Sequence, residues 1–331
     1  MRARTDPVRP PDALPAGFAS SVQALVGRDP SCLFGVAVSG GPDSMALLHL
    51  AGIAFPGRVA AATVDHGLRP ASAGEAAMVA QWCAAHAVPH ATLVPGARPT
   101  GNIQAWGRAQ RYALLGRWRL ERGIDWIMTA HHADDQVETV MMRLNRGAGV
   151  GGLAGVRARA GHVVRPLLRW GKAQLLAYAR HHHLPFVQDP SNADPRFDRA
   201  TLRTALAGVD WIDRQSVARS AAALAEAEEA LEWAADQLFA RHGRCDGGAC
   251  WLDRTDLPRE MVRRMVMRMI RTLRPDMASP RGDTIDRAIA AAMAGGQSSI
   301  GDLILKGGEC WTLRPAPPRR AIDAPETGRG V

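Results

Sequence analysis

Lysine is almost absent from this sequence. Of its 41 basic residues only Lys172 and Lys306 are lysines, and the other 39 are arginines. The chain nevertheless carries a formal net charge of +9. A positive balance of this size favours a polyanionic partner such as nucleic acid. The arginine bias itself carries little weight, because genomic composition also produces it.

Long apolar runs are absent as well. No stretch approaches 18 uninterrupted apolar residues, so the sequence predicts no membrane span and no membrane partner. The amino terminus has no basic segment followed by an apolar one, which is the pattern of a secretory signal. We therefore expect a cytoplasmic protein.

The five cysteines are scattered and include no Cys-x-x-Cys pair. Such a set fits a reducing compartment and gives no disulfide framework. Cys245 and Cys250, together with His242, are candidate zinc ligands, but their spacing is unusual and no fourth ligand is evident. A zinc site is therefore the weaker interpretation.

With 331 residues, of which 47% are hydrophobic, the chain is long enough for two domains with real cores. Short β-branched runs alternate with helical patterns in the first half, which predicts a doubly wound α/β fold with a parallel sheet covered on both faces. The expected strands are Leu33–Val38, Val59–Val64, Ala91–Val94, Trp126–Ala130 and Val163–Leu168. The expected helices of this half are Phe18–Val26, Ser44–Gly52, Ser72–His86, Gln104–Arg122 and Lys172–His183.

The first expected strand runs into a polar loop of six residues: Ser39, Gly40, Gly41, Pro42, Asp43 and Ser44. A strand, a glycine-rich loop and a helix start form a cradle for phosphate, since the first N–H groups of a helix lack partners and attract anions. The loop has neither the Gly-Lys-Ser/Thr of a Walker A motif nor a Gly-x-Gly-x-x-Gly fingerprint. A tight turn with a helix cap is the structural alternative.

Two further segments are expected near this loop, because the carboxyl ends of parallel strands share one edge of the sheet. Asp65 and His66 end the second strand and are read either as turn formers or as nucleotide contacts. Arg108 and Arg111 are three residues apart on a helix, so their guanidinium groups share a face that suits phosphate.

The segment after the fourth strand concentrates acidic and imidazole side chains. His131, Asp135 and Glu138 follow each other at helical spacing, so they lie on one side of a helix start. Simple helix capping also explains carboxylates at this position. The functional interpretation is a site that binds a metal ion or an ammonium group and accepts its proton.

Two later segments are rich in glycine, arginine and turn residues. The run from Arg143 to Gly155 is either a flexible linker or a loop that orders over an anionic ligand. The run from Asp189 to Arg203 contains Arg199 and Arg203, which share one helix face and would complete a phosphate clamp.

The six-residue loop resembles the PP-loop of the N-type ATP pyrophosphatases, and the motifs in their order resemble the tRNA(Ile)-lysidine synthetases. Two positions depart from the usual family pattern. Gly107 stands where the family usually has alanine, and Ala200 stands where asparagine is common. The resemblance is carried by Ser39–Ser44, Val64–Arg69, Arg108–Tyr112, Ala130–Thr139, Arg143–Gly155, Arg165–Leu168 and Asp189–Arg203.

This resemblance implies a fold like that of the adenine nucleotide alpha hydrolases and an ATP-dependent ligase. ATP and Mg²⁺ would serve to adenylate the wobble cytidine of tRNA(Ile) with a CAU anticodon, and L-lysine would then displace AMP. Residues implied for ATP binding are Ser39, Gly40, Gly41, Pro42, Asp43, Ser44, Asp65, His66 and Arg108. Catalytic roles are implied for Asp43, which is also the candidate Mg²⁺ ligand, and for Arg111, His131, Asp135, Glu138, Arg199 and Arg203. Asp135 and Glu138 would bind the lysine ammonium group.

The remaining chain predicts helices over Ile212–Arg241, Arg259–Arg274 and Thr284–Ala294 and a strand over Leu303–Thr312. In the second of these helices, methionines alternate with arginines, and Arg264, Arg268 and Arg271 are our candidates for tRNA phosphate contacts. The expected domains are an amino-terminal extension over 1–30, a PP-loop catalytic domain over 31–208 and a mainly helical tRNA-binding domain with a basic tail over 209–331.

Two other functions stay open from the sequence. Another PP-loop enzyme, such as a tRNA thiolase, is disfavoured because those chemistries use paired or catalytic cysteines. A non-catalytic RNA-binding protein is disfavoured by the intact acidic and arginine clusters. The sequence leaves open whether the chain forms a homodimer.

Overall fold

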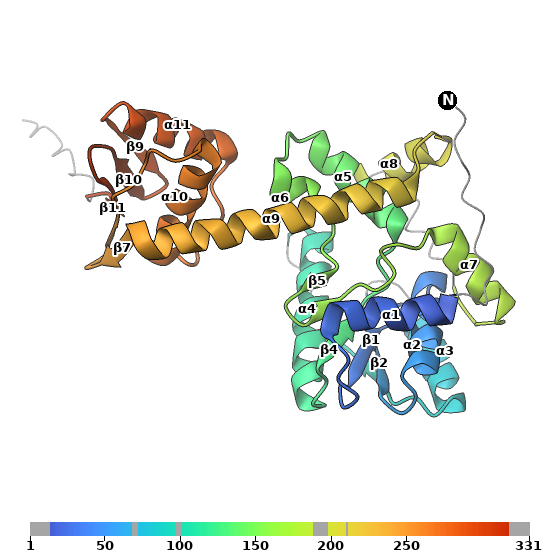
Figure 1. The fold of residues 1–331 in the computed structure, drawn as a ribbon. Helices are drawn as coiled ribbons and strands as arrows, with labels where there is room; N and C mark the ends of the chain where they lie inside the picture. Colours follow the sequence, from blue (N-terminus) through green and yellow to red (C-terminus); the bar gives the residue numbers. More distant parts are fainter. Residues whose placement is uncertain (1–13, 68–71, 97–100, 188–197, 210, 318–331) are drawn as a thin grey trace, which may run out of the picture. The chain divides into compact units, whose positions relative to one another are not determined.

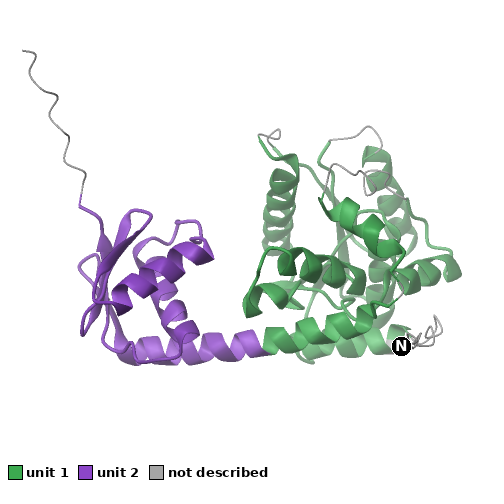
Figure 2. Ribbon diagram, turned by 90° about the horizontal axis from the view of Figure 1, so that it is seen from above, with its two compact units in different colours: residues 1–226 green, residues 227–331 purple. Residues whose placement is uncertain are grey.

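The computed structural model describes residues 14–67, 72–96, 101–187, 198–209 and 211–317 (Figure 1). The chain forms two compact units, residues 1–226 and residues 227–331 (Figure 2). The division falls inside the long helix α9 (Arg214–His242), a few turns beyond the domain boundary expected at residue 208. In the described part of the chain, no helix is both long and apolar enough to cross a membrane.

The first unit is built on a six-stranded sheet in the order β3-β2-β1-β4-β6-β5. All pairs are parallel except β5 with β6, which closes the edge as a short antiparallel hairpin. The prediction of a parallel sheet is therefore confirmed. The strands are β1 (Phe34–Ala37), β2 (Val59–Val64), β3 (His90–Leu93), β4 (Trp126–Met128), β5 (Arg159–Ala160) and β6 (Val163–Val164).

Helices cover both faces of this sheet, as expected. One face packs against α1, α2, α3 and α7 in a core that includes Phe18, Leu47, Val79 and Tyr178. The other face packs against α4 through Leu115 and Trp118. The helices of this unit are α1 (Leu14–Val26), α2 (Pro42–Ala54), α3 (Ser72–Ala85), α4 (Ile103–Glu121), α5 (Ala133–Leu144), α6 (Val150–Leu153), α7 (Lys172–His181) and α8 (Asp198–Ala207).

One strand is much shorter than its sequence indicates. The apolar run Val163–Leu168 contributes only Val163 and Val164 to β6, and the pairing with the β5 side ends at Arg165, whose N–H donates to the carbonyl of Ala158. The proline that follows has no N–H with which to continue a ladder. The buried Leu167 packs in the core outside any strand.

The second unit combines the end of α9 with α10 (Arg259–Leu273), α11 (Gly282–Met293) and a five-stranded antiparallel sheet in the order β7-β8-β11-β10-β9. The helices were expected, and the methionines Met261, Met265 and Met269 of α10 are buried as a core stripe should be. The sheet was not expected. Its strands are β7 (Gly243–Asp246), β8 (Ala249–Leu252), β9 (Gln297–Ile300), β10 (Leu303–Lys306) and β11 (Trp311–Pro315).

The expected single strand Leu303–Thr312 turns at Gly307 and Gly308 and becomes the hairpin of β10 and β11. The strands of this sheet are no shorter than most strands of the first unit, but β7 (Gly-Arg-Cys-Asp) and β9 (Gln-Ser-Ser-Ile) show no apolar run, so the sequence indicated only the segment that holds β10 and β11. Their pairing buries Leu305, Trp311 and Leu313 against the helices of this unit.

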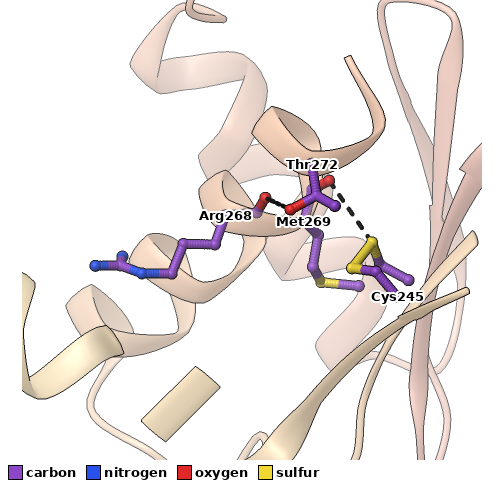
Figure 3. Close-up of a disulfide and its surroundings, with 5 residues drawn as sticks. Cys245, Arg268, Met269 and Thr272 are labelled. Carbon is purple, nitrogen blue, oxygen red and sulfur yellow. Dashed lines mark hydrogen bonds between the residues drawn. A yellow bond between two sulfur atoms is a disulfide. The ribbon is translucent and has the colours of Figure 1, made fainter. Parts of the chain in front are cut away.

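Cys245 and Cys250 face each other across the hairpin of β7 and β8 and form a disulfide. Figure 3 shows this disulfide beside Met269 and Thr272 of α10, and Cys250 Sγ lies 3.8 Å from the carbonyl oxygen of Met269. Among the described residues, no group of three or more His, Cys, Asp and Glu side chains is arranged to hold a metal ion. The zinc interpretation of these cysteines is therefore wrong, because their sulfurs bond to each other.

We expect Gly35→Ala to destabilise the first unit by about 1–3 kcal/mol, because overpacking a closed core costs that much. A Cβ on Gly35 in β1 would lie 2.5 Å from Trp118 and 2.8 Å from Ile127. Gly116→Ala is the matched control, since a Cβ there meets nothing within 4 Å and alanine favours the helix. Urea unfolding of both variants measures the difference. An unfolding free energy that is equal in Gly35→Ala and the wild type would contradict this packing.

Candidate active site

The loop between β1 and α2 is held in one conformation by hydrogen bonds among its own residues. Ser44 Oγ donates to the carbonyl of Gly41 at 2.9 Å and accepts the N–H of Ser39 at 3.1 Å. Gly40 has φ of 81°, a left-handed conformation that glycine adopts without strain. Its carbonyl accepts the N–H of Val187, which ties the loop to the segment after α7. The start of α2 therefore presents its N–H groups from a fixed backbone.

Asp43, in the first turn of α2, faces the segment that follows β4. Its Oδ2 lies 3.6 Å from Nε2 of His132, and its Oδ1 is buried without a hydrogen-bond partner among the described residues. An unpartnered buried carboxylate oxygen beside a phosphate loop fits a bound cation. The loops after β1 and β4 thus meet, as neighbouring parallel strands require.

His132 is a central residue that was absent from the predicted site. The ring is buried, and besides Asp43 it has Asp134 and Asp135 within 3.6 Å. Burial alone would lower the pKa of His132, but the three carboxylates outweigh it and raise the pKa above its ordinary value. Only the pairing of β1 with β4 brings Asp43 to this ring, so the local sequence gives no sign of it.

His131 has the opposite electrostatic environment. Burial, which Asp135 opposes and the guanidinium groups of Arg165, Arg108 and Arg199 reinforce, lowers the pKa of His131 to about 4. Its Nδ1 shares a hydrogen bond of 2.9 Å with Thr129 Oγ1. The ring is therefore neutral at pH 7 and can accept a proton at nitrogen.

Glu138 is 3% exposed and already carries two positive partners from α8. Arg199 Nε donates to Oε2 at 2.9 Å, and Arg203 donates through Nε to Oε1 at 2.6 Å and through Nη2 to Oε2 at 3.0 Å. The expectation that Arg199 and Arg203 share a helix face is confirmed. Oε2 accepts two of these hydrogen bonds and Oε1 one, so two guanidinium groups already neutralise the carboxylate that was expected to bind an ammonium group.

The two aspartates of the cluster begin helices. Asp135 Oδ2 accepts the N–H of His132 at 2.9 Å and so caps α5. Asp134 accepts the N–H of Lys172 at 2.7 Å, at the start of α7, and pairs with Arg214 at 2.8 Å. Both oxygens of Asp134 are thus engaged, one by a helix N–H and one by Arg214. Within the described ranges, Oδ1 of Asp135 accepts no hydrogen bond.

Asp65 and His66 follow β2 beside α4. The Asp65 carboxylate accepts the N–H of Gly67 at 2.8 Å, and its hydrogen bonds with Ser72 and Gly67 lower its pKa. Both ring nitrogens of His66 are buried and lack a partner in the part of the chain that the structure describes. Burial lowers the pKa of His66, and the nearby Arg111 lowers it further. An imidazole with two unsatisfied nitrogens fits a ligand edge that completes its hydrogen bonds.

The glycine-rich segment after α5 is fixed by side chains of α5. Arg143 Nη1 donates to the carbonyls of Gly152 and Gly155 at 2.7 and 2.9 Å. The Gln136 amide both donates to and accepts from the backbone of Val156, at 2.8 and 2.7 Å. Of the two interpretations left open, the structure favours a held loop over a free linker. The stretches Leu68–Arg69 and Asp189–Phe197 lie outside the described residues.

The three arginines expected to meet tRNA differ from one another. Arg264 pairs with Glu228, Glu232 and Glu260, and Arg268 pairs with Glu232 and Asp236. Their side chains are only 8% and 10% exposed. Arg271 is exposed. Arg264 and Arg268 face the acidic side of α9 within the second unit, a position in which their charge is already balanced.

Comparison with known proteins agrees with this geometry. Residues 16–209 match the PP-loop domain family, which defines the class of the first unit. The chain is 39% identical over 313 residues to the tRNA(Ile)-lysidine synthase of Zymomonas mobilis, covering 92% of this chain and 94% of that one. The enzyme of the same name from Novosphingobium aromaticivorans is 40% identical, with 93% and 96% covered. The chain belongs to the tRNA(Ile)-lysidine synthase family.

A solved structure supports the fold. The U34-tRNA thiolase NcsA from Methanococcus maripaludis superposes with a TM-score of 0.54 at 18% identity, covering 65% of this chain and 80% of that chain. Identity this low shows a shared fold and nothing about the reaction. The thiolase alternative therefore gains no support beyond the fold.

We expect the two neighbouring histidines to titrate far apart. In a pH titration followed by NMR, the ring signals of His131 should change near pH 4. Those of His132 should change at a pH above the ordinary pKa of histidine. Because the fold lowers the pKa of His131, the unfolded chain takes up this proton first, so stability is lost as pH falls from the ordinary histidine value towards 4. Single His131→Gln and His132→Gln variants assign the signals. A common midpoint for both rings would contradict the arrangement.

We expect Arg264→Ala to lower the stability of the second unit by about 1–3 kcal/mol, because Glu228 loses its cation, whereas Glu232 keeps Arg268 and Glu260 is half-exposed. Urea unfolding of the full chain measures this loss. Arg271→Ala is the matched control, since it removes an exposed arginine of the same helix and should leave stability within about 0.5 kcal/mol. An Arg264→Ala protein of unchanged stability would show that the ion-pair network does not form.

Proposed function

We propose that this chain ligates lysine to C2 of the wobble cytidine of a tRNA(Ile) with a CAU anticodon, which makes lysidine and changes the codon read from AUG to AUA. The observation that carries the proposal is the contact between the phosphate loop and the acidic cluster, where Asp43 approaches His132 at 3.6 Å. It supports a single site in which a nucleotide and an amine meet. Membership of the tRNA(Ile)-lysidine synthase family supplies the substrates.

ATP occupies the loop Ser39–Ser44, with its adenosine towards Asp65 and His66. The cytidine O2 attacks the α-phosphate and pyrophosphate leaves, so the cytidine becomes adenylated. Mg²⁺ supplies charge stabilisation for the leaving pyrophosphate when it is bound. Oδ1 of Asp43 is our candidate protein ligand, and the phosphates of ATP provide the other oxygens.

Arginines stabilise the charge that develops around the α-phosphate. Arg108, Arg111, Arg199 and Arg203 are the candidates, and the side chains of Arg199 and Arg203 are 42% and 35% exposed despite their bonds to Glu138. Charge-assisted hydrogen bonds to phosphate would draw these two guanidinium groups away from Glu138. That shift frees the Glu138 carboxylate for the lysine ammonium group, beside Asp135.

Lysine must lose a proton before its amine attacks C2 and AMP leaves. A free amine of this kind has a pKa of about 10.4, so it is protonated at neutral pH. His131, neutral and next to Asp135, is our candidate acceptor. Burial and, to a smaller extent, the surrounding arginines hold its pKa low, and an anion bound to these arginines would raise its pKa towards the range of a useful base.

The second unit holds the tRNA in this proposal, with Arg271 as a phosphate contact. Arg264 and Arg268 instead build the unit itself. The partners required are tRNA and L-lysine, the compartment is the cytoplasm where tRNA lies, and a homodimer is not needed. A thiolase reaction has less support, since the free cysteines of the described chain are Cys32, Cys83 and Cys310, and none lies in the loops after β1, β2 or β4.

Incubation of the protein with ATP, lysine and a tRNA(Ile) transcript carrying CAU should yield a lysine adduct on one cytidine, read by nucleoside mass spectrometry. Asp43→Asn should abolish adenylation, by more than about 100-fold, while tRNA affinity stays within about twofold. Glu121→Gln, which changes an exposed carboxylate at the end of α4, serves as the control substitution. Folded wild-type protein that forms no adduct would refute the proposed function, and equal loss of adenylation and tRNA binding in Asp43→Asn would give the loop a structural role.

A further inference from the structure

A set of arginines on the β4 and β6 side of the site has no phosphate assigned to it in the reaction described above, apart from Arg108 of α4. Arg143, Arg157 and Arg165, together with Arg108, form what we name the arginine cluster. Arg165 follows β6, Arg157 precedes β5, and Arg143 lies on α5. All four belong to the first unit.

Arg165 is the most buried member, with 7% of the residue exposed. Its Nη1 donates to the carbonyl of Arg157 at 2.8 Å, and its Nη2 lies 3.4 Å from the hydroxyl of Tyr112. Its Nε is buried with no acceptor among the described residues. A buried guanidinium without a carboxylate is costly, so its N–H groups are prepared for an anion.

Arg157 repeats this pattern on a segment that cannot easily move away. Its Nη1 is buried and lacks an acceptor within the described ranges. The preceding residue, Val156, is bonded on both backbone atoms by the Gln136 amide. A Cβ on Gly155 would come within 2.2 Å of that same amide, so glycine is needed for this close approach. The fold thus holds Arg157 beside Arg165.

The cluster carries an excess of positive charge. Burial lowers the pKa of Arg143, and Arg157, Arg108 and Arg199 lower it further. The carboxylate of Glu138, on the same helix as Arg143, is already engaged by Arg199 and Arg203. Repulsion of this kind is relieved when an anion binds among the guanidinium groups.

We propose that the arginine cluster is a second phosphate-binding site, separate from the loop Ser39–Ser44, and that it holds a phosphodiester of the anticodon strand next to the target cytidine. This inference rests on the proposed function. Arg157 and Arg165 act as positioning residues, because they grip the backbone and do not touch the reacting base. Phosphate contacts of this type fix the register of a nucleic acid without reading its sequence.

The position of the cluster favours RNA over ATP as the source of the phosphate. Strand β6 lies two strands from β1, which is about 10 Å across the sheet. Asp65 and His66 lie after β2, on the opposite side of β1, so a nucleotide running from them to the loop ends before it reaches β6. A cavity of about 490 Å³ lies beside Arg143 and Arg199 and is large enough for an extruded nucleotide.

The test is a double-mutant cycle that combines one change in the protein with one change in the RNA. An anticodon stem-loop carries a neutral methylphosphonate at one phosphodiester at a time around the wobble cytidine, and affinity is measured by filter binding with wild type and Arg157→Ala. We expect one position at which the methylphosphonate weakens wild-type binding about tenfold, and at which Arg157→Ala shows no further loss. Arg157→Ala should also reduce the salt slope by about one, while its affinity for ATP stays unchanged.

Two variants serve as comparisons. Arg165→Lys keeps the positive charge but loses Nε and the planar guanidinium group. We expect a smaller loss of affinity at the same phosphodiester than in Arg157→Ala. Arg122→Ala is the control, because this exposed arginine ends α4 at the opposite edge of the sheet, where β4 begins. It should leave both the affinity and the salt slope close to those of wild type.

The outcomes separate the possible ligands. Weaker ATP binding by Arg157→Ala with unchanged RNA binding would assign the cluster to ATP and overturn the inference. Unchanged affinity for both, in a folded variant, would show that no phosphate binds there. If wild type forms no lysine adduct on the full tRNA, the proposed function fails separately, because stem-loop binding is measured without the reaction.

Discussion

The buried imidazole of His132 holds the active site together. Three carboxylates lie within 3.6 Å of its ring, from Asp43, Asp134 and Asp135. These carboxylates also contact different helices. Asp43 lies in the first turn of α2, and Asp135 caps α5. Asp134 accepts the N–H of the first residue of α7 and pairs with Arg214 of α9. The raised pKa of His132 is the electrostatic sign of that role.

The neighbouring His131 shows how strongly the position of a charge determines chemistry. The two rings are adjacent in sequence and both are buried, yet three carboxylates outweigh the effect of burial on the pKa of His132. At His131, burial lowers the pKa, and the guanidinium groups reinforce that effect against the single carboxylate of Asp135. One imidazole therefore favours its charged form and supports structure, while the other stays neutral and is suited to accept a proton. Anions that bind to the arginines would bring His131 towards the pKa of a base, so substrate binding and proton transfer are linked.

The arginines of this protein have three different roles, which composition cannot separate. Arg264 and Arg268 neutralise the acidic face of α9 and are buried in the second unit. Arg199 and Arg203 neutralise Glu138 while remaining partly exposed. The third group has buried nitrogen atoms with no acceptor among the described residues and no carboxylate partner there, which supports the proposed contact with an external anion; its members are Arg157 and Arg165. Helix spacing alone favoured Arg264 and Arg268 for tRNA binding. Spacing shows which side chains share a helix face, but it does not show which residues pack against that face.

The sequence by itself determined the parallel sheet, the phosphate loop at Ser39–Ser44 and the acidic start of α5, since strand–helix alternation and helix spacing are local properties. The small sheet of the second unit was missed because β7 and β9 consist mostly of polar residues and show no apolar run, whereas the equally short β1 of the first unit does. Only the tertiary structure decided that Asp43 meets His132, that Glu138 is bound by Arg199 and Arg203, and that Cys245 pairs with Cys250. Each of these depends on which strands and helices become neighbours, and pairing between separate segments leaves no periodic trace in the chain.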